Sequence, residues 1–159
     1  MTAILELKNV TKIVNTGIEE EKVILNDVSL DIFEHDFITI LGGNGAGKST
    51  LFNVIAGTLP LTSGDIYILG ENVTSYSPEK RAKYLSRVFQ DPKMGTSPRM
   101  TVAENLLIAK FRGEKRRLVS RRLSHYRKEF QETIDKIGNG LEKHLDTPIE
   151  FLSGGQRQA

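Results

Sequence analysis

Nine consecutive residues, four of them glycines, constrain the fold of this chain more than any other feature. They match the pattern G-x-x-x-x-G-K-[ST], in which a glycine-rich turn precedes a lysine and a hydroxyl residue. Backbone amides can converge on a phosphate group only where the chain curls tightly, and glycine permits that curvature. We therefore predict a phosphate-binding loop formed by Gly42, Gly43, Asn44, Gly45, Ala46, Gly47, Lys48, Ser49 and Thr50.

Two side chains inside this loop suit a triphosphate with its magnesium ion. Lys48 can place one positive charge among the β- and γ-phosphate oxygens, and it is a candidate catalytic residue. The Ser49 hydroxyl is the expected Mg²⁺ ligand, because Mg²⁺ prefers oxygen ligands. A glycine-rich turn that matches the pattern by accident is the other interpretation. With glycine at about 7% of average sequence, two fixed glycines followed by lysine and serine rarely coincide.

The residues on either side of the loop support this interpretation. Residues 37–41 form a short apolar run typical of a β-strand, and residues 51–56 form a plausible helix that ends at Gly57. A strand, a glycine-rich loop and a helix in this order are the structural context that the motif requires. Further strands are predicted near residues 4–7, 23–32, 65–69 and 87–89.

Composition excludes several classes of protein. The 159 residues are 38% hydrophobic and 26% charged, contain no cysteine and carry a net charge of +2. A disulfide framework and a cysteine-based metal site are therefore excluded. The sequence shows neither a secretion signal nor an apolar stretch of membrane-spanning length. We expect a soluble, cytoplasmic chain whose membrane role, if any, comes through a partner.

Helical patterns dominate from residue 100 onward. Thr101 and Glu104 form a predicted capping box ahead of an apolar run. One apolar helix face, interpreted as core, is predicted from the spacing of Leu123, Tyr126, Phe130, Ile134 and Ile137. Nine basic residues between Lys110 and Lys128 predict a solvated face. A contact with a membrane-protein partner or anionic lipid is the sharper alternative, and nucleic acid is disfavoured because no aromatic residues are interleaved for stacking.

A second anion-accepting element is predicted near the end of the sequence. Ser153 and Gln156 have the spacing of a capping box, so a helix should begin here. Gly154 and Gly155 occupy its first turn and leave backbone amides without side-chain cover. An ordinary helix cap with loop glycines is an equally simple interpretation of this segment alone. The phosphate-binding loop earlier in the chain shifts the balance towards a second phosphate contact.

Together, residues 42–50 and the sequence Leu152-Ser-Gly-Gly-Gln156 resemble the ATP-binding subunit of an ABC transporter, whose signature is LSGGQ. The resemblance covers essentially all of residues 1–159. It implies an α/β fold of the P-loop NTPase class, with a RecA-like core, an antiparallel β subdomain and a helical subdomain at residues 100–151. ATP and Mg²⁺ are the implied ligands.

The resemblance also implies partners and residue roles. Gln90 is similar to the glutamine that ligates Mg²⁺ and senses the membrane partner. Two copies would pair head to tail, as a homodimer or heterodimer, so that Ser153, Gly154, Gly155 and Gln156 face the ATP held by the other copy. Closure of the pair would drive a transmembrane permease from the cytoplasmic face of the membrane. A substrate-binding protein is a further possible partner.

Two departures from the family pattern are present. No aromatic residue precedes Phe33, so Val14 is the expected adenine contact. After Ser153 the sequence contains neither an apolar run ending in Asp-Glu nor a histidine. We therefore expect the fold to be incomplete at its C-terminal side and the chain alone not to hydrolyse ATP. The alternatives left open are a soluble, non-transport ABC-type ATPase and an inactive nucleotide-binding fragment.

Overall fold

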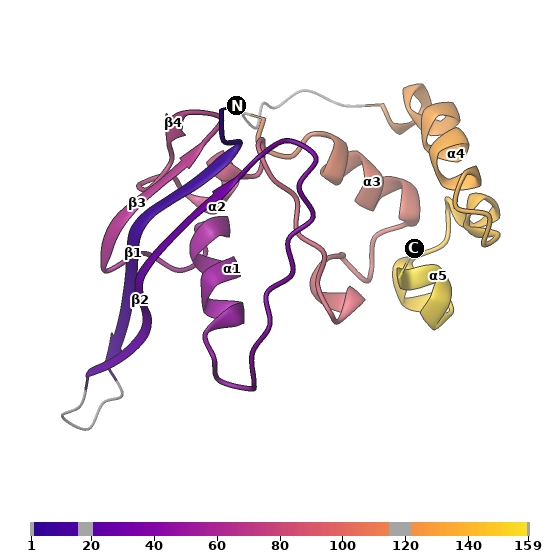
Figure 1. Cartoon of the computed structure of the whole chain (residues 1–159). Coiled ribbons are helices and arrows are strands. Elements are labelled where there is room, and N and C mark those ends of the chain that lie inside the picture. The colour runs from indigo at the N-terminus through magenta and orange to yellow at the C-terminus, as the bar shows by residue number, and fades with distance from the viewer. Residues whose placement is uncertain (1, 16–20, 115–121, 159) are drawn as a thin grey trace. The chain divides into compact units, whose positions relative to one another are not determined.

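The computed structural model describes residues 2–15, 21–114 and 122–158. The chain divides into two compact units, one comprising residues 1–85 and the other residues 86–159 (Figure 1). The first unit contains the described strands and the predicted phosphate-binding loop, and the second contains the predicted signature.

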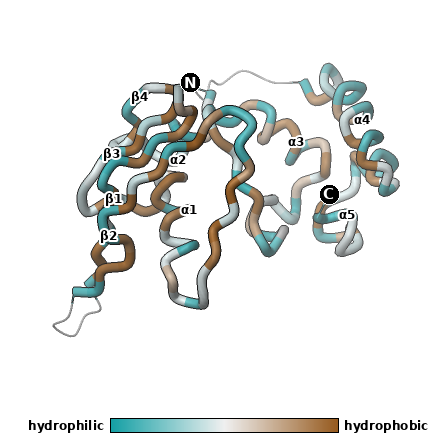
Figure 2. The backbone as a smooth tube through the Cα atoms, in the orientation of Figure 1, coloured by the Kyte–Doolittle hydropathy of each residue, from teal (hydrophilic) through white to brown (hydrophobic). Residues whose placement is uncertain are grey.

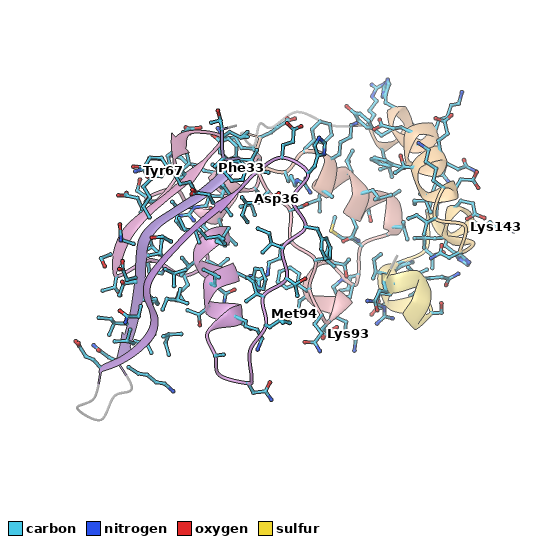
Figure 3. The ribbon with its side chains drawn as sticks, in the orientation of Figure 1. Phe33, Asp36, Tyr67, Lys93, Met94 and Lys143 are labelled. Atoms are coloured by element: carbon cyan, nitrogen blue, oxygen red, sulfur yellow. The ribbon has the colours of Figure 1, made fainter. Side chains whose placement is uncertain are left out.

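The first unit contains an antiparallel sheet, whose strands lie in the order β2-β1-β3-β4. Its strands are β1 (Leu5–Asn15), β2 (Glu21–Ile32), β3 (Ser63–Ile68) and β4 (Glu71–Asn72). Val28, Leu30 and Ile32 are half-buried between exposed neighbours on β2, as their alternation predicted. The turn after β2 is closed by the Asp36 carboxylate, which accepts a hydrogen bond from the Phe33 amide at 2.8 Å (Figure 3).

Two helices accompany this sheet. Helix α1 (Lys48–Ala56) ends at Gly57, which has a φ of 77° and satisfies the last carbonyls of the helix, as predicted. Helix α2 (Pro78–Arg81) begins with proline in its first turn. Apolar residues of α1, of the sheet and of the segment after β4 form a common core, which consists of Leu7, Val10, Leu25, Leu51, Val54, Ile66, Ile68 and Val73.

The strands predicted at residues 37–41 and 87–89 are not formed in this structure. Both segments are irregular, and Phe37, Leu41 and Val88 are 94%, 86% and 92% exposed. Figure 2 shows hydrophobic colouring along the loop between β2 and α1 that contains the first segment. An apolar run of this kind is stable as a strand only when neighbours pair with it and cover its faces. Within the described ranges no strand pairs with either segment.

The second unit consists of short helices. They are η1 (Pro92–Met94), α3 (Val102–Lys110), η2 (Leu123–His125), α4 (Arg127–Asp135), η3 (Leu141–His144), η4 (Ile149–Phe151) and α5 (Gly154–Gln158). Thr101 and Glu104 form the predicted capping box at the start of α3. The apolar faces of the helices enclose a core made of Val102, Ala103, Phe130, Ile134, Leu141, Leu145, Ile149 and Leu152.

The apolar stripe predicted at residues 123–137 is only partly one helix face. Phe130 and Ile134 of α4 are buried, and Leu123 and Tyr126 pack beside them from η2 and the turn that follows it. Ile137 lies beyond the end of α4 and is 49% exposed. The chain turns there because Gly138 adopts a φ of 70°, which favours glycine.

Part of the basic stretch falls outside the described residues, namely Lys115, Arg116, Arg117 and Arg121. Lys110 forms an ion pair with Glu129 at 2.6 Å, and the Arg127 Nη1 donates to Asp146 Oδ1 at 2.7 Å. These pairs fit the solvated face that was predicted. Among the described residues no helix is both long enough and apolar enough to cross a membrane.

Candidate functional site

The backbone of the predicted phosphate-binding loop uses conformations that favour glycine. Gly42, Gly45 and Gly47 have φ values of 156°, 82° and 84°. A side chain at these angles would strain the backbone, which explains why the pattern needs glycine at its first and sixth positions. The loop is exposed from Gly42 to Ala46, so its amides can be reached by a ligand.

Gly47 also lies against the edge strand β2. A Cβ atom built at this position would come within 2.9 Å of the Ile24 carbonyl oxygen and 3.3 Å of its side chain. No such contact exists at Gly45, where a Cβ atom would meet open space. Close approach to β2 is therefore a second reason for glycine at position 47.

The start of α1 is open to an anion. Gly47 is the N-cap, and no side chain in the described part of the chain caps the helix. The first hydrogen bond of the helix runs from the Leu51 amide to the Gly47 carbonyl at 2.9 Å. Within the described ranges the amides of Lys48, Ser49 and Thr50 have no acceptor, and they lie at the positive end of the helix dipole. A phosphate group would satisfy these donors.

The side chains of Lys48 and Ser49 occupy the same end of α1. Lys48 Nζ donates to the carbonyl oxygens of Gly42 at 2.5 Å and Gly43 at 2.7 Å, so its charge already lies inside the curl of the loop. The exposed Ser49 hydroxyl makes no hydrogen bond to any described residue. The described part of the chain contains no group of three histidine or acidic side chains that could hold a metal ion.

The second predicted anion element has the local geometry that its sequence predicted. The Gln156 amide donates to Ser153 Oγ at 3.3 Å, and Gln156 Oε1 accepts from the Ser153 amide at 3.2 Å, which closes a capping box. Gly154 and Gly155 are exposed, and a Cβ at either would meet nothing within 4 Å. Among the described residues their amides have no acceptor.

The remaining predicted site residues lie apart from these two elements in the sequence. Gln90 is exposed and directly precedes the segment that leads into η1, whose Lys93 and Met94 are labelled in Figure 3. Val14 is half-buried near the end of β1, where it pairs with Lys22 of β2. The roles of Gln90 in Mg²⁺ binding and of Val14 in adenine contact stay predictions.

Sequence reasoning missed a buried cation behind α1. Arg81 is 3% exposed, and its guanidinium donates to the carbonyls of Val54, Ile55 and Thr74, each at 2.8 Å. Burial lowers the pKa of Arg81, because the charged form loses water. In a run of polar residues such as 79–81, nothing in the sequence separates a buried arginine from a surface one.

Sequence reasoning also missed Asn105 on α3. Its side chain hydrogen-bonds to the backbone of residues 97–101 through both its oxygen and its nitrogen. An asparagine inside a predicted helix is a weak sequence signal, because asparagine is a poor helix former whose side chain readily hydrogen-bonds to nearby backbone groups. That signal indicates a local backbone contact without naming the partner.

Comparison with known proteins places these elements in one family. The family model described as "ABC transporter" matches residues 25–159. A curated relative, the tyrosine transport ATP-binding protein of Clostridioides difficile, is 39% identical over 98% of this chain. The chain spans 61% of that relative's length.

Solved structures agree with the sequence match. An ATP-binding cassette solved as a dimer in a post-hydrolysis state with ADP and phosphate superposes with a TM-score of 0.75 at 30% identity, over 97% of this chain and 65% of the other. A second ATP-binding cassette of an ABC transporter gives a TM-score of 0.71 at 30% identity, over 99% and 62% of the two chains. The P-loop NTPase fold class predicted from the sequence is thereby confirmed.

Proposed function

Because this chain belongs to the ABC transporter ATP-binding family, we propose that it binds ATP and forms part of an ATPase that powers transport across a membrane. The observation that carries this proposal is the open start of α1. Three amides that have no acceptor among the described residues, the Lys48 charge and a glycine loop converge there, and this arrangement suits the phosphates of a nucleotide. ATP with Mg²⁺ is the proposed ligand.

Different residues of the proposed site would bind the phosphates, the metal ion and the base. In this proposal the loop amides and Lys48 hold the phosphates, and Ser49 and Gln90 contribute oxygen ligands to Mg²⁺. Catalysis of this kind depends on positioning and on neutralising charge in the transition state. The metal would supply charge neutralisation at the β- and γ-phosphate oxygens, while Val14 would contact the adenine.

The exposed glycines at the start of α5 support a paired arrangement. In the proposed head-to-tail pair, Ser153, Gly154, Gly155 and Gln156 contact the ATP held by a second copy. The dimeric cassette among the structural relatives supports this arrangement. Pairing on ATP binding would then move a transmembrane permease partner from the cytoplasmic side. The relative named for tyrosine transport makes an amino acid the first cargo to test.

Nucleotide binding is tested by titrating this chain with a fluorescent ATP analogue in the presence of Mg²⁺. We expect Lys48→Ala to weaken binding at least tenfold, because it removes the only side-chain charge inside the described loop. The matched control is Lys80→Ala, which removes an exposed lysine on α2. Equal affinity of the Lys48→Ala variant and the unmodified chain would contradict the proposal.

A further inference from the structure

The Asn105 side chain closes a turn ahead of α3. Its Oδ1 accepts from the Ser97 amide at 2.8 Å, and its Nδ2 lies 3.1, 3.2 and 2.9 Å from the carbonyl oxygens of Ser97, Met100 and Thr101. The carbonyls of Ser97 and Thr101 also accept from the backbone amides of Met100 and Asn105, at 3.1 and 3.0 Å, so the Asn105 side chain adds to the backbone hydrogen bonds of this turn. Residues 97–101 form the entry turn of α3.

The entry turn is joined by backbone hydrogen bonds to the segment that precedes α5. The amides of Ile149 and Glu150 donate to the carbonyls of Met100 and Pro98 at 3.1 and 3.0 Å. Thr101 and Pro148 form an antiparallel bridge beside them. The Met100 carbonyl therefore accepts from both the Asn105 side chain and the Ile149 amide. These contacts hold residues 148–150 against the entry turn.

Arg157 completes the connection to α5. Its Nη2 donates to the carbonyls of Glu150 at 3.1 Å and Leu152 at 3.2 Å, while its own amide donates to the Ser153 carbonyl at 2.9 Å. A helix of five residues is too short to hold its orientation by itself. The guanidinium thus fixes α5 to the same segment that the entry turn holds.

We propose that Asn105 and Arg157 are positioning residues that hold Ser153, Gly154 and Gly155 in place for the ATP of a second copy. The entry turn follows Gln90 by seven residues in the sequence. This inference rests on the proposed function, in which the signature contacts nucleotide. It assigns no contact with ATP to either residue.

The test uses the complete gene product and the variants Arg157→Met and Asn105→Asp. Methionine keeps much of the arginine's apolar stem without its donors, and aspartate keeps the shape of asparagine but cannot donate to three carbonyls. We expect both variants to bind the fluorescent ATP analogue within twofold of the unmodified protein. We expect kcat for ATP hydrolysis and ATP-driven pairing in sedimentation to fall at least tenfold, with Arg157→Lys intermediate.

Matched controls separate this effect from loss of charge or of an amide group. Arg99→Met removes an exposed arginine within the entry turn, and Gln131→Ala removes an exposed amide side chain on α4. Both should hydrolyse ATP as the unmodified protein does. Normal hydrolysis by Arg157→Met and Asn105→Asp would overturn the proposal. Failure of the unmodified protein to bind ATP would instead contradict the proposed function.

Hydrogen exchange gives a readout that does not depend on activity. In Asn105→Asp, the amides of Ile149, Glu150 and Arg157 should exchange at least tenfold faster, while those of Phe130 and Ile134 keep their rates. A merely structural role would raise exchange throughout the second unit, including at Phe130 and Ile134. That outcome, or unchanged exchange at Ile149 and Glu150, would also overturn the proposal.

Discussion

Gly45 and Gly47 show why individual residues of the loop are not equivalent. Their φ values of 82° and 84° are almost the same, so a side chain at either would carry similar backbone strain. Their surroundings differ, because only position 47 lies against a backbone carbonyl of β2. Comparing substitutions at these two glycines therefore separates the free-energy cost of backbone strain from the cost of steric contact with β2.

Alanine at these two positions measures that difference. We expect Gly45→Ala to destabilise the chain by about 1–2 kcal/mol through strain alone. Gly47→Ala should cost roughly 2–5 kcal/mol, because the new methyl group also displaces the loop from Ile24. Urea unfolding gives both values. Equal costs would show that crowding against β2 is absent.

At the scale of elements, α1 is held differently at its two ends. No described side chain caps its start, whereas two carbonyls at its end accept hydrogen bonds from the buried Arg81 guanidinium. A cation at the C-terminal end of a helix interacts favourably with the helix dipole. Arg81 also reaches Thr74, so it fixes the end of α1 to the segment after β4 and leaves the phosphate-facing end free.

Replacing Arg81 by methionine tests this anchor. The carbonyls of Ile55 and Thr74 would lose the Arg81 donor at a cost of about 1–3 kcal/mol each, whereas the Val54 carbonyl still accepts from the Gly57 amide. The cost is partly offset because a buried charge is removed. We expect a net loss of roughly 2–4 kcal/mol in the free energy of unfolding. Lys80→Met, which removes an exposed charge from the same helix, should change it by less than about 1 kcal/mol. Similar losses in both variants would exclude the anchor.

The start of α4 carries a pH-dependent contact. The Arg127 guanidinium holds the pKa of the Asp146 carboxyl below its ordinary value of 3.8, mainly through their hydrogen bonds. A carboxyl whose pKa is lower in the folded state adds stability above its unfolded pKa, and that stability disappears as pH falls through the folded pKa. This contribution should therefore be present at pH 6 and decline below about pH 3.8.

Asp146→Asn removes that dependence. We expect the variant to lose less free energy of unfolding between pH 6 and pH 3 than the unmodified chain. Asp135→Asn, which removes an exposed carboxylate at the end of α4, is the control. The interpretation fails if the Asp146→Asn variant and the unmodified chain lose the same amount over this range.

At the scale of the whole molecule, the sequence predicted turns, loops and helix ends better than it predicted which segments pair as β-strands. The glycine loop, the end of α1 at Gly57 and the two capping boxes at Thr101 and Ser153 were predicted correctly, because each depends on residues within one turn. The strands at residues 37–41 and 87–89 were wrong for this structure, because a strand depends on partners elsewhere. Arg81 was missed because its carbonyl partners on α1 lie 27 and 26 residues away in the sequence. Asn105 was missed because an asparagine in a helix indicates a local backbone contact without naming the partner.

Because residues 37–41 and 87–89 are mostly exposed, substitutions at their exposed positions should have little effect on the free energy of unfolding. Val88 is 92% exposed, whereas Val54 of α1 is fully buried at 0%. Val88→Thr should change the free energy of unfolding by less than about 0.5 kcal/mol. Val54→Thr places a hydroxyl in the core and should cost about 1–3 kcal/mol. A comparable loss from Val88→Thr would show that this segment is packed in solution.

The central claim is that the amides at the start of α1 bind the phosphates of ATP. Nuclear magnetic resonance of the ¹⁵N-labelled chain, titrated with ATP and Mg²⁺, reports on each amide directly. We expect the largest shifts at Gly45, Gly47, Lys48 and Ser49, with adenosine producing none of them. ATP-dependent shifts confined to other parts of the chain, with these four amides unchanged, would contradict the account.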